Sequence, residues 1–214
     1  MLSILCNYFV GIHLTKRSPK TLWRKRLLLL LALGINLGVL LWFKDWSGAE
    51  VLPLGISFYT FQILSYLIDV YRGEVSREYS FPKFATYVIM FPKLISGPIT
   101  RYGEVADRSF TVQGLEDGMK LFILGLAAKV LLADRVGILW HEVQVTGFES
   151  ISTPLAWLAA IAYSMKIYFD FWGYSLMAMG LGRMLGIELP ANFRRPYMAR
   201  SVRDFYRRWH MTLG

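Results

Sequence analysis

The sequence lacks most of the features that define soluble enzyme families. Its single cysteine, Cys6, excludes an intrachain disulfide, and no spacing of cysteine or histidine fits a metal site. It has no Walker loop, no dinucleotide-binding glycine motif and no Gly-x-Ser-x-Gly elbow. These absences argue against NTPases, nucleotide-dependent dehydrogenases and soluble-type esterases. Acidic residues are also few: 15 Asp and Glu stand against 24 Lys and Arg, which gives a net charge of +9.

Hydrophobic residues, by contrast, are abundant and gather in blocks. They make up 55% of the 214 residues, and the mean hydropathy is +0.39. The blocks approach the ~20 residues that a helix needs to cross a bilayer core, so they predict an all-α, polytopic integral membrane protein with several transmembrane helices. We predict one membrane domain over residues 1–214, with spans over 1–14, 27–43, 51–70, 119–140 and 154–180, a re-entrant or broken segment over 84–99, and a cytoplasmic interfacial region over 186–214.

The basic residues lie between the hydrophobic blocks. Loops rich in Lys and Arg are typical of the cytoplasmic side of a membrane, where they meet anionic lipid headgroups. The charge pattern therefore predicts the lipid bilayer, and not nucleic acid, as the partner of these residues. The first such loop carries Lys16, Arg17, Lys20, Arg24, Lys25 and Arg26.

Residues 84–99 are apolar but contain Pro92, Lys93, Gly97 and Pro98. Proline removes a backbone donor and glycine adds conformational freedom. We therefore expect a broken or re-entrant segment that is buried against protein, rather than an unbroken helix facing lipid.

The last stretch of the chain has the pattern of a basic amphipathic helix. At about 100° per residue, the large apolar residues of 202–213 share one face, arginines gather on another, and His210 falls on the seam. Such a helix is expected to lie in the interface plane of a membrane. Within it, Asp204 is spaced to pair with Arg208 or Arg200.

Five segments resemble the membrane-bound O-acyltransferase family, specifically its bacterial alginate O-acetylase and D-alanyl transfer branch. They occur in the family's order and cover about three quarters of the chain. The segments are PLGISFYTFQILSYLIDVYRG (53–73), FPKLISGPITRY (91–102), GLAAKVLLADRV (125–136), YFDFWGYSLMAMGLG (168–182) and LPANFRRPYMARSVRDFYRRWHMTL (189–213).

The resemblance implies an enzyme of the bacterial inner membrane, with several spans, that moves an acyl group onto a hydroxyl. An O-acetylase of alginate or another exopolysaccharide is the first expectation, and D-alanyl transfer to teichoic acid is the alternative. The resemblance further implies an acyl donor reached from the cytoplasm, either acetyl-CoA or another acyl carrier, and no tightly bound cofactor. The expected partners are the exported polysaccharide and periplasmic acetylation proteins.

The chemistry needs a base for the attacking hydroxyl, and a neutral imidazole suits that role. His210 matches the motif-embedded histidine of the family branch and is the first catalytic candidate, while the family's invariant histidine normally lies further on. Asp170, a carboxylate inside an apolar run, is the second candidate, with pairing to Lys166 or a distant arginine as the structural alternative. The donor-binding candidates are Arg101, Arg207, Arg208 and Trp209.

Two readings from other classes remain open. The chain starts late in the family's pattern and stops just after the Arg-Trp-His motif, so it is also interpreted as a catalytically incomplete membrane fragment or half of a split enzyme. Lys129 and Asp170, both in predicted spans, motivate a transporter or channel, which ion flux in proteoliposomes would test. Asp69 and Arg72 are interpreted as an interfacial ion pair.

Overall fold

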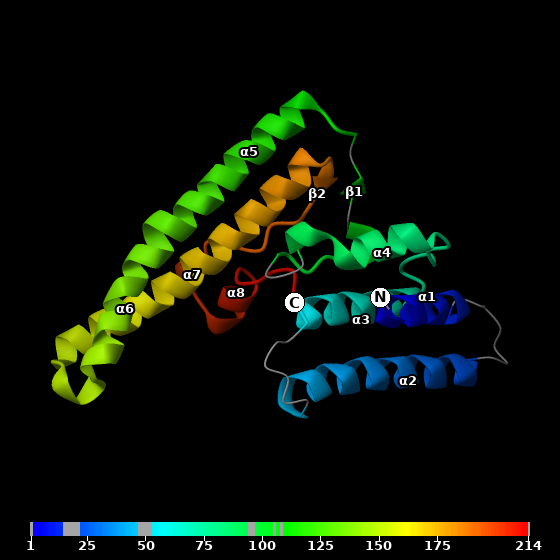
Figure 1. Cartoon of the computed structure of the whole chain (residues 1–214), viewed down its shortest axis with the longest axis horizontal. Helices are drawn as coiled ribbons and strands as arrows, with labels where there is room; N and C mark the ends of the chain where they lie inside the picture. The colour runs from blue at the N-terminus through cyan, green and yellow to red at the C-terminus, as the bar shows by residue number, and fades with distance from the viewer. Residues whose placement is uncertain are drawn as a thin grey trace. The chain divides into compact units, whose positions relative to one another are not determined.

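The computed structural model describes residues 2–14, 22–46, 53–93, 97–104, 106–107 and 109–213, most of which are helical (Figure 1). The chain divides into two compact units. Unit 1 comprises Met1–Ile95 and Ile99–Val105, and unit 2 comprises Ser96–Pro98 and Ala106–Gly214. Three residues of the predicted basic loop, Lys16, Arg17 and Lys20, lie outside the described residues, as do residues 94–96 of the predicted broken segment.

The described part of unit 1 contains four α-helices. Helix α3 contacts α1, α2 and α4, so it is the central element of this unit (Figure 1). The elements are α1 (Leu2–Leu14), α2 (Leu22–Leu41) with a π-helical continuation η2 (Trp42–Trp46), α3 (Ile56–Arg72), α4 (Phe81–Ile89), and the short 3-10 turns η3 (Phe91–Lys93) and η4 (Tyr102–Glu104).

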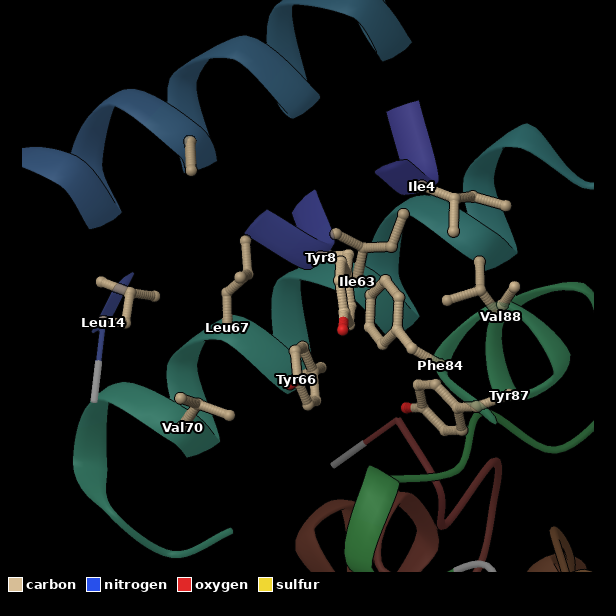
Figure 2. Packing of buried hydrophobic residues seen from close by; sticks show 12 residues of the cluster. Ile4, Tyr8, Leu14, Ile63, Tyr66, Leu67, Val70, Phe84, Tyr87 and Val88 are labelled. Atoms are coloured by element: carbon tan, nitrogen blue, oxygen red, sulfur yellow. The ribbon is translucent and has the colours of Figure 1, made fainter. Parts of the chain in front are cut away.

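Large side chains fill the interior of unit 1. Tyr66 and Ile63 of α3 and Phe84 of α4 are fully buried, and the Tyr66 and Phe84 rings lie 4.8 Å apart (Figure 2). Tyr8 of α1 packs against the same cluster, since its ring lies 6.0 Å from that of Phe84. Burial of side chains of this size is the main stabilising contribution to such a core.

Two hydrogen bonds between asparagine side chains join α1 to α2. The side-chain amide of Asn7 donates to the Asn36 carbonyl oxygen at 3.0 Å, and that of Asn36 donates back to Asn7 at 2.8 Å. Both residues are buried, so each amide satisfies the other away from solvent. Within the described residues, Leu22–Asp45 is the one helix that is both long and apolar enough to cross a membrane.

The expected break in residues 84–99 is present. Helix α4 ends at Ile89, the chain makes the short turn Phe91–Lys93, and residues 97–101 are not helical. Tyr87 fixes the far side of the break, because its hydroxyl donates to the Thr100 carbonyl at 2.7 Å. The placement of this segment in a membrane stays a prediction.

Unit 2 is a long helical hairpin with a folded C-terminal segment. Helices α5 and α6 continue one another through a π-helical turn, and α7 lies alongside them (Figure 1). The elements are α5 (Val112–Ala127), η5 (Ala128–Ala133), α6 (Asp134–Thr146), η6 (Phe148–Ser150), α7 (Thr153–Met184), η7 (Pro196–Met198), α8 (Val202–Tyr206), and the two-residue antiparallel strands β1 (Ala106–Asp107) and β2 (Ile187–Glu188).

Glycines set the separation of α5 and α7. A Cβ atom on Gly125 would lie 2.5 Å from the carbonyl oxygen of Gly173, and one on Gly118 would lie 2.6 Å from that of Gly180. Neither distance is possible for a real side chain, so the two backbones are in direct contact. Close approach through small residues is the way in which helices pack inside membranes, where lipid competes with large apolar side chains.

The amphipathic helix predicted over 202–213 is wrong in its extent, because α8 ends at Tyr206. The Arg208 and Trp209 amides both donate to the Phe205 carbonyl, and His210 then adopts a left-handed backbone with φ of 49°. The predicted pairing of Asp204 with Arg208 is confirmed, at 2.8 Å. Helical periodicity alone could not show that contacts to residues 192–194 outcompete a longer helix.

Candidate functional site

The Arg-Trp-His motif is held by pairing with residues 192–194. The Arg194 amide donates to the Arg208 carbonyl at 2.9 Å, and the Met211 amide donates to the Asn192 carbonyl at 2.9 Å. Between these two bonds the chain is fixed on both sides of His210. Backbone pairing of two loop segments leaves their side chains in defined positions.

Asn192 ties this paired segment to helix α7. Asn192 is 1% exposed. Its side-chain Nδ2 donates to the Ser175 hydroxyl at 3.2 Å, and its side-chain Oδ1 accepts from the Thr212 hydroxyl at 3.0 Å. A buried amide that bonds to two different segments is costly to replace, because its partners would lose their bonds. Asn192 is therefore a positioning residue for the motif that contains His210.

An aromatic cluster completes the attachment to α7. Tyr168 and Trp172 stack with ring centroids 5.9 Å apart, and Phe193 meets the edge of Tyr168 at 5.8 Å. Trp209 packs against Phe193 at 5.1 Å and stacks on Phe205 at 5.6 Å. Each such aromatic pair contributes about 0.5–1.5 kcal/mol beyond its burial.

His210 lies at the edge of this cluster, with its ring 4.9 Å from that of Phe171. Its Nε2 atom is buried and has no hydrogen-bond partner in the part of the chain that the structure describes. Burial lowers the pKa of His210 below its ordinary value, so the imidazole is neutral at pH 7. A neutral ring with an unused nitrogen has the properties of a general base.

Three arginines and three aromatic residues line a pocket of about 470 Å³ beside the motif. Arg195 has a left-handed backbone, with φ of 47°, and Arg208 uses its Nε atom to bind Asp204. Left-handed backbone is uncommon outside glycine and is found where the surrounding structure imposes it, often at functional sites. The lining residues are Tyr168, Trp172, Phe193, Arg194, Arg195 and Arg208.

Asp170 forms a separate charged cluster. Its carboxylate lies 2.9 Å from the Lys129 ammonium, which also binds Asp134 at 2.7 Å. The π-helical turn Ala128–Ala133 makes this possible, because five-residue spacing places Lys129 and Asp134 on the same face there. The partner of Asp170 is thus Lys129 on the neighbouring helix, and neither Lys166 nor a distant arginine.

The structure brings together only part of the predicted site. Arg208, Trp209 and His210 lie in one cluster, whereas Arg207 is exposed and does not line the pocket. In the described part of the chain no hydrogen bond or ion pair joins Asp170 to His210, and the Asp170 carboxylate pairs with Lys129 instead.

Arg101 belongs to unit 1 and pairs with Glu74 at 4.0 Å. The predicted pairing of Asp69 with Arg72 is wrong. Arg72 binds Glu74 at 3.7 Å, while buried Asp69 accepts a hydrogen bond from Ser65. Glu74, which lies just after helix α3, therefore pairs with both Arg72 and Arg101. The helical spacing did not indicate this residue.

Sequence reasoning missed Asn192, Arg194 and Arg195. Asn192 carried a usable signal, because a polar amide between apolar and proline residues has to find buried partners. The pairing of Lys129 with Asp170 was also readable in principle, since opposite charges in adjacent predicted spans seek one another. The two arginines carried no local signal, since exposed arginines are common in any basic loop.

The fold and this site define a helical, membrane-type protein with a neutral histidine beside a cationic, aromatic pocket. The profile of the membrane-bound O-acyltransferase family matches residues 71–213. The probable alginate O-acetylase AlgI of Pseudomonas putida is 36% identical over 98% of this chain and 48% of its own length. The peptidoglycan O-acetyltransferase of Helicobacter pylori is 33% identical over 99% of this chain and 49% of its own length.

A third relative is more distant. The teichoic acid D-alanyltransferase of Streptococcus thermophilus is 30% identical over 75% of this chain and 41% of its own length. The chain belongs to the membrane-bound O-acyltransferase family. It spans about half the length of the curated relatives that it matches.

Proposed function

We propose that this chain forms part of an O-acyltransferase that moves an acetyl group onto hydroxyls of an exported polysaccharide, with alginate as the first candidate. The observation that carries the proposal is the buried Nε2 atom of His210, which has no hydrogen-bond partner among the described residues and lies on a ring whose pKa burial lowers, within the residues that match the family. Relatives whose names specify O-acetylation match nearly the whole chain, which favours an acetyl group over D-alanine.

In the proposed reaction, the acceptor hydroxyl gives its proton to Nε2 of His210 as its oxygen attacks the acyl carbon. The bond between the acyl carbon and the donor's leaving atom then breaks, and the leaving group takes the proton back from the imidazole. Arg208, two residues before His210, carries a positive charge that favours negative charge developing nearby. The donor, acetyl-CoA or another acyl carrier, is proposed to approach from the cytoplasm, and Arg101, Arg207, Arg208 and Trp209 remain the donor-binding candidates.

The position of the site along α7 bears on how donor and polymer meet. The Tyr197 hydroxyl donates to the Ser164 carbonyl at 3.0 Å, and Asn192 bonds to Ser175, so the C-terminal segment packs against the middle of this helix. If α7 crosses the membrane as the sequence predicts, the arginines lie at depth and need water or protein around them. A water-filled recess at this place would shorten the path from cytoplasm to acceptor.

The test is the acetyl content of the host's exopolysaccharide with and without this gene, in a strain that lacks any full-length relative. We expect acetylation to be restored when the chain is expressed with a complementing downstream half. Acetylation by the chain alone would also support the activity. Absence of acetylation in both settings, with the protein abundant in the membrane, would leave the non-catalytic fragment as the better account.

A histidine pair provides the matched control. His210→Ala should abolish the restored acetylation while leaving membrane abundance unchanged, because only this ring lies in the motif. His141→Ala changes an exposed histidine of α6 and should have no effect. Equal acetylation by the two variants would remove His210 from the site.

We further propose that the chain lies in the bacterial inner membrane and that periplasmic acetylation proteins are its partners. Co-purification of these proteins with the chain would test the partnership.

A further inference from the structure

We propose that the pocket lined by Arg194, Arg195 and Arg208 is a binding site for a phosphate group that is carried next to an apolar part of its ligand. The proposal rests on the proposed function in one respect, because Arg208 is also a donor-binding candidate there; it adds the chemical class of the group that this site binds. Three observations carry it: an excess of positive charge, a fixed geometry and an aromatic wall.

Within the residues that the structure describes, the pocket carries more positive than negative charge. Three arginines line it, and among the described residues Asp204 is the one carboxylate that pairs with any of them, through Nε of Arg208. Like charges held close together raise the free energy of the folded state unless an anion enters between them. An oxyanion with several acceptor oxygens satisfies more than one guanidinium at once, and arginine binds phosphate in this way.

The arginines are held by backbone structure and not by chance proximity of long side chains. The hydrogen bond from the Arg194 amide to the Arg208 carbonyl places these two residues opposite each other. Arg195 follows in a left-handed conformation, which turns the chain at the pocket. A left-handed arginine costs free energy, and its persistence beside two other arginines is explained if the arrangement serves binding.

The wall of the pocket is aromatic. Tyr168 and Trp172 present two rings that are parallel to within 5°, and Phe193 stands against Tyr168 at 83°. Such a surface takes a flat or apolar group beside the anion. The arginines would bind the phosphate itself, even as an inorganic anion, and the aromatic wall would contact the group that the phosphate is attached to.

Two sources of such a phosphate are distinguished by experiment: a soluble phosphate ester and the headgroup of an anionic phospholipid. For the first arm, the full chain in detergent is titrated calorimetrically with inorganic pyrophosphate. For the second arm, the full chain is placed in nanodiscs of phosphatidylglycerol or phosphatidylcholine, and native mass spectrometry counts the lipids retained after release.

The variant pair isolates the pocket from the general basic charge of this region. The double variant Arg194→Gln with Arg195→Gln removes two charges from the pocket, and the control Arg200→Gln with Arg203→Gln removes two exposed charges elsewhere in the same segment. We expect the pocket variant to weaken pyrophosphate binding about tenfold or more, and the control to change it less than about twofold. Thermal melting of both variants checks that the fold is kept.

Loss of pyrophosphate binding in the pocket variant alone supports a soluble phosphate ester. Loss of retained phosphatidylglycerol in the pocket variant alone supports a lipid headgroup. The proposal is overturned if the wild-type chain binds neither probe, or if the pocket and control variants lose binding equally. His210→Ala should keep both kinds of binding, so failure of this proposal is separable from failure of the proposed acyl transfer.

Discussion

The two units of this protein are stabilised in different ways. Unit 1 buries large side chains such as Tyr66, Phe84 and Ile63 around one helix. In unit 2, the residues that α7 buries are Ala, Gly and Ser with the exception of Leu176. Small residues bring helices together and leave large side chains outside, where the aromatic cluster of the candidate site is built. The comparison teaches that one unit relies on packed volume and the other on close backbone contact.

The largest effect is expected from removing volume in unit 1. Phe84→Ala deletes a fully buried ring that contacts Tyr8 and Tyr66, and it should lower the free energy of unfolding by about 3–5 kcal/mol. Denaturant unfolding in detergent measures it. Phe110→Ala, at a ring that is 65% exposed in unit 2, is the matched control and should change stability little. Equal losses would contradict the role of volume in unit 1.

The opposite change, adding volume, should affect unit 2. Gly125→Ala introduces a Cβ atom only 2.5 Å from the Gly173 carbonyl, so α5 and α7 must separate. We expect a cost of about 1–3 kcal/mol and reduced membrane abundance. Gly38→Ala in α2, where nothing lies within 4 Å, should be neutral or slightly stabilising because alanine favours helix. A neutral Gly125→Ala would mean that the hairpin is not closely packed.

A smaller and more selective effect is expected at the buried amides. Asn36→Ala in unit 1 and Asn192→Ala in unit 2 each leave polar partners buried, at a cost of about 1–3 kcal/mol. Only Asn192→Ala should also weaken pyrophosphate binding and acetylation, because it loosens the segment that carries Arg194 and His210. Comparing calorimetric binding with unfolding for both variants tests this. Loss of binding in Asn36→Ala as well would show that any destabilisation impairs the pocket.

The sequence predicted the helices better than it predicted the contacts between side chains. Apolar blocks and the prolines near residue 92 located the helices and the break after α4, because these depend on local composition. The partner of Asp170 and the end of α8 depend on residues distant in the chain, Lys129 and Asn192, and no local periodicity encodes them. The resemblance located the Arg-Trp-His motif, but not the arginines that fold back beside it.

The smallest effect concerns the titration of His210. Burial lowers its pKa in the folded protein below the ordinary value of 6.5, so the folded state favours the neutral ring. The resulting contribution to stability is fully present above pH 6.5 and is lost as the pH falls through the lowered folded pKa. Between pH 7.5 and 5.5, the wild-type melting temperature should therefore fall more than that of His210→Asn. Asparagine suits the replacement because it tolerates the left-handed backbone at this position.

The pH dependence of stability also differs between the two units. Glu78 of unit 1 titrates in a lower pH range than His210 of unit 2. Burial alone would raise the pKa of Glu78, but hydrogen bonds from the Tyr102 hydroxyl and the Ser80 amide hold it below its ordinary value of 4.5. Its contribution is present above pH 4.5 and is lost only at lower pH. The interval from 7.5 to 5.5 thus reports on His210 without Glu78. Identical pH dependence in wild type and His210→Asn would show that the imidazole is not held neutral by burial, and would remove the main physical argument for His210 as a base.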